Sequence, residues 1–208
     1  MSLFELNSVF LSFDGRPVLE EFSLLIREGE KVVLRGSSGS GKSSLLKLLL
    51  GFVEPDQGEV RYRGEKMSPE VAREVRRSVA YVSQAVDWEP GNVDETIREF
   101  FSIGATGEVP SASSIREVLE RLRLSPEVLD QRIQDLSGGE RHRIGVAIGL
   151  LLERPVFLLD EPTAALDASL KEAVADRFLN RDDWTVIAAA HDPVWFEERE
   201  VTIIDLDS

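Results

Sequence analysis

Short segments that hold only apolar residues alternate along this chain with longer segments of helical periodicity. Residues 156–159 and 186–190 are apolar throughout. Such runs are typical of parallel strands covered on both faces, and the segments between them would form the covering helices. Nearer the start, residues 59–63 alternate apolar and polar positions, as expected of an antiparallel strand with one solvated face. The pattern predicts an α/β fold with a parallel-sheet core and a smaller antiparallel sheet beside it.

The same pattern, combined with turn and capping signals, sets the expected bounds of the elements. The expected strands are 4–13, 18–26, 31–34, 59–63, 79–82, 156–159, 186–190 and 201–206. The expected helices are 43–50, 68–77, 93–103, 114–122, 138–152 and 170–179. Residues 85–135 hold helices and no convincing strand. We therefore expect a single domain, 1–208, in which 1–84 and 136–208 form the core with its antiparallel sheet and 85–135 form an inserted helical subdomain.

Composition narrows the possible functions. The 208 residues are 42% hydrophobic, enough for a sizeable buried core. A net charge of -14 offers no positive surface to a phosphate backbone, so we expect no nucleic acid among the partners. The absence of cysteine excludes disulfides and thiolate chemistry. The longest uncharged apolar run, residues 144–152, is too short to span a bilayer, so any membrane role must come through a partner.

Residues 36–43 read Gly-Ser-Ser-Gly-Ser-Gly-Lys-Ser and match the phosphate-loop pattern G-x-x-x-x-G-K-[ST]. Glycines let backbone N–H groups close around phosphate oxygens, and the helix that follows directs its positive end at the same anion. Lys42 would add a charge for the β- and γ-phosphates, and Ser43 a hydroxyl for Mg²⁺. The expected nucleotide contacts are Gly36, Ser37, Ser38, Gly39, Ser40, Gly41, Lys42, Ser43 and Ser44. The alternative is a flexible Gly/Ser linker, and the loop alone does not distinguish a kinase, a GTPase, a motor or a transporter.

A pair of carboxylates, Asp160 and Glu161, follows the apolar run 156–159. Ligands of open α/β sheets bind at the carboxyl ends of such strands. Asp160 is placed to hold Mg²⁺ through water. Glu161 points elsewhere because side chains alternate along a strand, so it can face an attacking water. The alternative is an acidic turn before Pro162.

Residues 136–140, Leu-Ser-Gly-Gly-Glu, open the predicted helix 138–152 and leave its first N–H groups free. Ser137, Gly138 and Gly139 would therefore form a second anion site, built as the first one is. One nucleotide needs only one phosphate loop. The second site suggests a γ-phosphate that arrives from another subunit, and the alternative is an ordinary serine-capped helix.

These motifs, in this order and over nearly the whole chain, resemble those of the ATP-binding cassette, or ABC, ATPases. Gln84 matches the family's glutamine loop, His191 its switch histidine, and Phe13 the aromatic residue that stacks on adenine. Residues 165–167 look like the family's D-loop. The departures are Glu140 in place of glutamine, Ala164 in place of serine and Ile148 in place of arginine. None of them removes a catalytic group.

The resemblance implies a P-loop NTPase (RecA-like) fold, a parallel-sheet core with an antiparallel β subdomain and a small helical subdomain. It implies ATP and Mg²⁺ as cofactors and hydrolysis of the β–γ phosphoanhydride bond. The implied catalytic residues are Glu161 as general base, His191, Lys42 and Gln84. The implied Mg²⁺ ligands are Ser43, Gln84 and Asp160.

The resemblance also implies partners. Two cassettes would pair head to tail around ATP, as a homodimer or a heterodimer with a second ABC ATPase. The pair would work on a separate membrane-spanning transporter subunit, from the cytoplasm, on the inner face of the cell membrane. The segment 90–97 resembles the corresponding part of exporter-like members. The alternatives are a non-transport ABC ATPase that acts as a nucleotide-driven assembly scaffold, and a nucleotide-binding regulator that does not hydrolyse.

Overall fold

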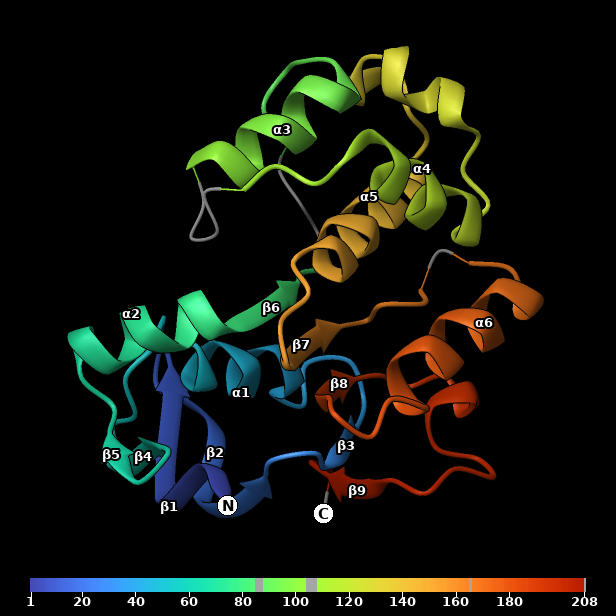
Figure 1. The fold of residues 1–208 in the computed structure, drawn as a ribbon. Helices are drawn as coiled ribbons and strands as arrows, with labels where there is room; N and C mark the ends of the chain where they lie inside the picture. The colour runs from blue at the N-terminus through green and yellow to red at the C-terminus, as the bar shows by residue number, and fades with distance from the viewer. Residues whose placement is uncertain (85–87, 104–107, 165, 208) are drawn as a thin grey trace.

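The computed structural model describes residues 1–84, 88–103, 108–164 and 166–207. They form two sheets with helices packed around them, and a group of helices stands on one side of the larger sheet (Figure 1). The predicted α/β architecture is confirmed.

The antiparallel sheet is formed by the first two strands and a later hairpin. Its strand order is β2-β1-β4-β5. The strands are β1 (Ser2–Phe13), β2 (Arg16–Arg27), β4 (Gln57–Tyr62) and β5 (Glu65–Lys66). Asp14 and Gly15 both have positive φ, as a tight two-residue hairpin turn between β1 and β2 requires. This turn leaves Phe13 at the end of β1, paired with Arg16.

The core sheet is parallel in every pairing, with the order β6-β7-β8-β3-β9. Its strands are β3 (Lys31–Arg35), β6 (Val79–Val82), β7 (Val156–Asp160), β8 (Thr185–Ala189) and β9 (Thr202–Asp205). Because the strands are parallel, their carboxyl ends lie along one edge of the sheet. The segments that leave β3, β6, β7 and β8 therefore start side by side at that edge.

Both faces of the parallel sheet are covered, as the apolar runs predict. On one face, α1 (Lys42–Leu49) and α2 (Pro69–Ser78) share a buried cluster with the antiparallel sheet. On the other face lie α5 (Gly138–Leu151) and α6 (Ala168–Leu179). Val33 belongs to the second cluster, and its neighbours Val32 and Leu34 belong to the first. The two-residue period of a strand thus divides the core into two halves.

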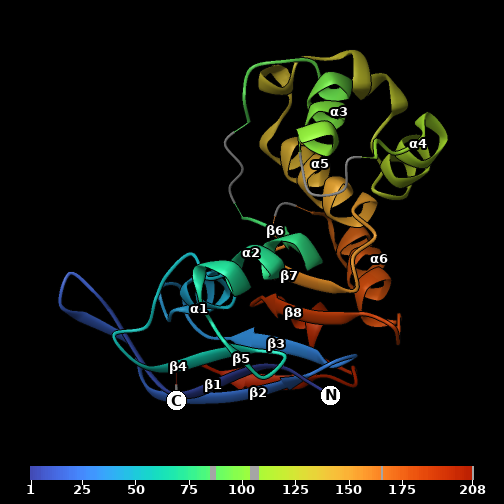
Figure 2. The same ribbon diagram turned by 60° about the vertical axis from the view of Figure 1, so that its left-hand side comes forward.

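The helical lobe contains α3 (Val93–Ile103), α4 (Ala112–Arg121) and the short 3-10 helices η1 (Pro126–Asp130) and η2 (Ile133–Asp135). It stands beyond the end of β6, and α5 leads from it towards the sheet (Figure 1 and Figure 2). Apolar residues of the lobe join the same buried cluster as α5. The division into subdomains at 85–135 stays a prediction.

Several element ends differ from the predicted ones because of local hydrogen bonds. Helix α4 begins at Ala112 since the Ser111 hydroxyl accepts a bond from the Ser114 N–H, 3.1 Å. Helix α6 begins at Ala168 since Asp167 accepts one from the Leu170 N–H, 3.0 Å. The two-residue β5 and the 3-10 helices were not predicted, because such short elements have no periodicity. No helix in the described part of the chain is long and apolar enough to cross a membrane.

Candidate functional site

The phosphate-loop segment joins β3 to α1 at the carboxyl edge of the parallel sheet. Gly36, Gly39 and Gly41 have φ of 156°, 87° and 99°. A Cβ on Gly36 would lie 2.4 Å from Ser40 Oγ, and one on Gly41 would lie 2.6 Å from Val18 Cγ1. The closed shape of the loop therefore requires glycine at these positions.

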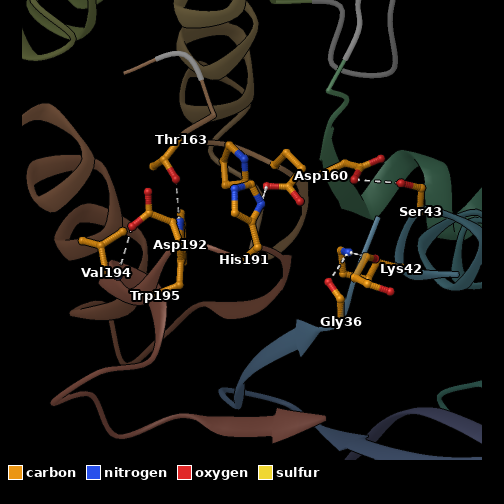
Figure 3. Close-up of polar contacts among 12 residues, drawn as sticks. Gly36, Lys42, Ser43, Asp160, Thr163, His191, Asp192, Val194 and Trp195 are labelled. Carbon is orange, nitrogen blue, oxygen red and sulfur yellow. Dashed lines mark hydrogen bonds and ion pairs between the residues drawn. The ribbon is translucent and has the colours of Figure 1, made fainter. Parts of the chain in front are cut away.

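Lys42 folds back across the loop from the first position of α1. Its Nζ donates to the carbonyl oxygens of Gly36 and Ser37, each at 2.8 Å (Figure 3). The residue is only 8% exposed. The hydroxyl of Ser40 is buried and has no hydrogen-bond partner among the described residues. The loop thus surrounds a cation whose partners here are neutral carbonyls, an arrangement that suits a phosphate group.

Asp160 ends β7, whose five residues are all buried. The Ser43 hydroxyl, one residue after Lys42, donates to Asp160 Oδ1 at 2.9 Å (Figure 3). Burial raises the pKa of Asp160. The hydrogen bond from Ser43 lowers this pKa, and the negative charge of Glu161 raises it further. A cation beside Asp160 would relieve the cost of a buried carboxylate.

The residues around Asp160 fit a magnesium ion. A serine hydroxyl and a carboxylate are oxygen ligands of the kind that Mg²⁺ prefers. Gln84 lines the same cavity as Ser43 and Asp160. The described residues contain no cluster of three or more His, Cys, Asp or Glu side chains that could hold a metal. Such a sparse set is compatible with Mg²⁺, which keeps several waters and shares phosphate oxygens with its substrate.

The side chains of Glu161, which follows β7, and His191, which follows β8, contact each other. Glu161 Oε2 lies 2.9 Å from His191 Nδ1. The Glu161 N–H donates to the carbonyl of Ala189 at 2.9 Å, and its φ of 51° is unusual for a non-glycine residue. The Glu161 side chain is 13% exposed and that of His191 is 68% exposed. The strained backbone therefore turns a shielded carboxylate towards an imidazole that is open to solvent.

Two buried contacts support the turn after Glu161. The carbonyl of Pro162 lies 2.9 Å from His142 Nε2, on α5. The hydroxyl of Thr163 accepts a bond from the Trp195 indole N–H at 3.0 Å (Figure 3). Trp195 ends the short helix η3 (Pro193–Trp195), which begins two residues after His191. The acidic pair is thus braced from α5 and from the segment that carries His191.

One cavity of about 740 Å³ collects most of the predicted site residues. Its wall includes Phe13, Gln84, Asp160, Glu161 and His191, with every predicted phosphate-loop residue except Ser40. Phe13, at the end of β1, is 43% exposed. The segment after Gln84, residues 85–87, lies outside the described residues, as does Ala165 of the predicted D-loop.

The other predicted anion site lies apart from this cavity. Ser137, Gly138 and Gly139 are absent from the cavity wall as the described residues define it. Ser137 caps α5, and Ser137 and Glu140 form a capping box in which each side chain bonds the other residue's backbone N–H. Ser137 and Gly138 are exposed. The structure therefore brings the predicted phosphate loop and the acidic pair together, and it places the start of α5, the second predicted anion site, outside their cavity.

Some residues of the site were not predicted. Asp207 accepts hydrogen bonds from the Ser37 N–H at 2.6 Å and from the Ser37 hydroxyl at 2.9 Å. Val18 and Ala164 also line the cavity. The position of Val18 follows from the hairpin that pairs β1 with β2. Asp207 has no local signal, because 170 residues separate it from Ser37.

A sequence model of the ABC transporter family matches residues 19–164. The transport/processing ATP-binding protein ComA of Streptococcus pneumoniae is 32% identical over 198 residues, which cover 93% of this chain and 27% of that protein. The spermidine/putrescine import ATP-binding protein PotA of Mesoplasma florum is 32% identical over 209 residues, covering 98% of this chain and 57% of that protein. The chain thus spans only part of the length of these relatives.

Solved structures show the same fold. A dimeric post-hydrolysis state of the ATP-binding cassette MJ0796, bound to ADP and Pi, superposes with a TM-score of 0.83 at 27% identity, covering 98% of this chain and 94% of that one. A bacterial Atm1-family ABC exporter with ATP bound gives 0.82 at 22% identity, covering 99% and 37%, and shows the fold alone. The chain belongs to the ABC transporter family and has the fold of its ATP-binding cassettes.

Proposed function

We propose that this chain hydrolyses ATP and, as one half of an ATP-bridged dimer, powers a transporter through a separate membrane-spanning subunit. The observation that carries the proposal is the meeting of Lys42, Asp160, Glu161 and His191 in a single cavity of about 740 Å³. A phosphate loop beside an acidic pair and an exposed histidine is the set of groups that phosphoryl transfer to water needs.

The phosphate loop would bind the triphosphate. Its backbone N–H groups and the start of α1 supply partial positive charge, and Lys42 would turn from its carbonyl partners towards the β- and γ-phosphates. Phe13, partly exposed at the mouth of the cavity, would stack on adenine. Mg²⁺, held by Ser43, Asp160 and Gln84, would neutralise charge on the phosphate oxygens.

Glu161 would act as the general base. One of its carboxylate oxygens lies against His191, which leaves the other to accept a hydrogen bond from an attacking water. His191 would fix the orientation of the carboxylate and contact the γ-phosphate from its solvent-exposed position. Because the transition state is loose, positioning and charge neutralisation supply most of the rate enhancement.

A second copy of the cassette would complete the site. A Cβ on Gly138 would meet no atom within 4 Å, and its φ is not one that side chains avoid. Packing within this chain therefore does not require glycine there, whereas close approach of a phosphate to the backbone would. Ser137, Gly138 and Gly139 of each copy would contact the γ-phosphate held by the other, and the pair would open after hydrolysis.

The transport role rests on the family and on the path from the site to the lobe. Gln84 follows β6 on the cavity wall, between the core and the helices that begin with α3. Movement of the lobe could thus report the nucleotide state to a membrane subunit on the inner face of the membrane. The partner cassette is either a second copy or a related ATPase, and the membrane subunit would select the substrate.

The substitution Glu161→Gln tests the assignment of the base, because it keeps the size of the side chain and removes its basicity. We expect phosphate release to fall by about a hundredfold or more while ATP binding persists. An ATP-bound dimer should then accumulate in light scattering. Glu198→Gln is a matched control, since Glu198 also has positive φ and is exposed.

Multi-turnover phosphate release by Glu161→Gln near the wild-type rate would refute the assignment of the base.

Transport is tested separately by copurification from membranes. Recovery of the chain with a multi-span membrane protein is expected, and ATP-driven dimerisation without any such partner would instead favour an assembly scaffold.

A further inference from the structure

A separate cavity of about 480 Å³ lies between the lobe and the core. Its wall combines Arg121 at the end of α4, Leu150 of α5, Arg177 in the last turn of α6, and Arg181, two residues after that helix. We call it the arginine pocket. Helices α4 and α6 lie on the same side of the molecule in both views (Figure 1 and Figure 2). The arginine pocket shares no wall residue with the cavity of about 740 Å³ around Lys42 and Asp160. Its size is that of a small-molecule site.

Arg177 is the arginine of this pocket that has no ion pair among the described residues. Its Nε is buried and has no hydrogen-bond partner among the described residues. Burial lowers its pKa, and the charges of Arg121 and Arg181 lower it further. The charges of Glu117 and Asp183 oppose this lowering. A guanidinium that loses water without gaining an ion pair is costly, and an anion in contact with it would offset that cost.

The two other arginines of the pocket and its carboxylate on the described wall are already paired. The pairs are Arg121 with Glu117 at 2.6 Å, Arg181 with Asp183 at 2.8 Å, and Asp176 with Arg199. Asp176 is the one carboxylate on the described wall of the arginine pocket. Glu117, Glu153 and Asp183 line a neighbouring cavity of about 430 Å³, whose wall also includes the three arginines of the pocket. The described wall of the pocket itself therefore carries three arginines and one carboxylate, although the whole chain is acidic.

The arginine heads are also held in place. The guanidinium carbons of Arg177 and Arg181 lie 5.1 and 4.8 Å from the centre of the Trp184 ring, within the range of cation–π contact. A cation is favoured at the carboxyl end of α6 by the helix dipole. That preference explains a positive residue at this position but not its missing hydrogen-bond partners.

The rest of the wall is apolar. Leu122, Leu150, Val174 and Phe178 line the pocket beside the arginines. We propose that the arginine pocket binds an organic anion, in which one carboxylate or phosphate group contacts Arg177 and a short apolar body lies against these four side chains. Because Arg121 belongs to the lobe and Arg177 to the core, such a ligand would bridge the two.

Titration of the nucleotide-free chain with hexanoate and hexyl phosphate tests this proposal without depending on the ATPase. The indole N–H signal of Trp184, followed by NMR, reports on the pocket because the ring contacts Arg177 and Arg181, which line it. Saturable binding of either probe is expected, with a dissociation constant of roughly millimolar order for so small a ligand, and the tighter of the two identifies the head group. Acetate, which lacks the apolar body, and 1-hexanol, which lacks the charge, should both bind more weakly.

Arg177→Met removes the charge at nearly constant volume and should weaken binding by about tenfold to a hundredfold. Arg116→Met on the exposed side of α4 is the matched control and should bind as the wild type does. Thermal unfolding verifies that each variant is folded. If Arg177→Met does not fold, Arg121→Gln should still weaken binding from the lobe side. The proposal is overturned if neither anionic probe binds in the millimolar range, if 1-hexanol binds as tightly as hexanoate, or if a folded Arg177→Met or Arg121→Gln variant binds unchanged.

Discussion

The hydroxyl of Ser137 is occupied by Glu140, so Glu140→Gln should strengthen the proposed ATP-bridged dimer. Glu140 Oε2 accepts bonds from the Ser137 hydroxyl at 2.6 Å and from the Ser137 N–H at 2.9 Å. These bonds lower the pKa of Glu140, which keeps it charged at neutral pH. A serine hydroxyl has one proton, and the charged carboxylate of Glu140 competes for it with a phosphate oxygen more strongly than a neutral glutamine amide would.

The size of the effect follows from these distances. A phosphate oxygen bonded to the Ser137 hydroxyl would lie about 2.7 Å from Oγ, so at most about 5.3 Å from the Glu140 oxygen that is 2.6 Å away. Two unit charges at that separation repel by about 0.8 kcal/mol in bulk water and by about 3 kcal/mol at an effective dielectric of about 20. Glu140 is half-buried, so after screening we take about 1 kcal/mol per site. Two sites in a homodimer give about 2 kcal/mol, or about thirtyfold in the dissociation constant of the dimer.

The assay is sedimentation of the chain with ATP in a Glu161→Gln background, which keeps ATP intact. Glutamine still fits the capping box, so α5 should stay folded. Glu99→Gln on the exposed face of α3 removes the same formal charge away from Ser137 and serves as control. The advantage of Glu140→Gln should shrink as salt is added. Dimerisation no tighter than that of the control would refute the reasoning.

Other predictions concern the loop, the core and an acid-sensitive pair. Lys42→Ala should abolish detectable ATP binding in calorimetry, and unchanged affinity would contradict the loop assignment. Gly149→Ala would place a Cβ 2.6 Å from Val82 Cγ2, so we expect a loss of about 1 kcal/mol in urea unfolding, in which overpacking outweighs the gain in helix propensity. In a Val82→Ala background the same change should become stabilising, and stabilisation in both backgrounds would show that the contact is harmless. The Arg181 hydrogen bond lowers the pKa of Asp183 from 3.8 to about 2, so the stability from this pair is present above pH 3.8 and lost as pH falls towards 2. The stability deficit of Asp183→Asn should therefore narrow as pH falls through that range, and a constant deficit would show that the pair does not titrate.

The parts of the fold and site that the sequence predicts are those whose physical cause is local. The run 156–159 is apolar because β7 is buried on both faces, and Asp160 and Glu161 follow it directly. The order of strands and helices then brings the segments after β3, β7 and β8 to one edge. Local pattern and topology together place Lys42, Asp160 and His191 around the same cavity.

The unpredicted parts depend on contacts between distant segments. Asp207 bonds Ser37 across 170 residues, and nothing near Asp207 in the chain indicates this. The arginine pocket likewise needs α4, α5 and α6 to be packed before its three arginines converge. In the sequence, Arg121, Arg177 and Arg181 look like ordinary charges at helix ends. Only the folded structure shows that Arg121 and Arg181 form ion pairs and that Arg177 forms none among the described residues.

The glycines of the two predicted anion sites differ in how closely other atoms of the chain surround them, and this difference bears on the proposed dimer. Gly36 and Gly41 are required by the chain itself, since a Cβ there would lie 2.4 Å from Ser40 and 2.6 Å from Val18. Gly138 has open space around it and no positive φ, so alanine would fit and would favour the helix. Packing within the described chain therefore does not explain the glycine at 138, whereas the proposed approach of a phosphate held by a second cassette would use that space.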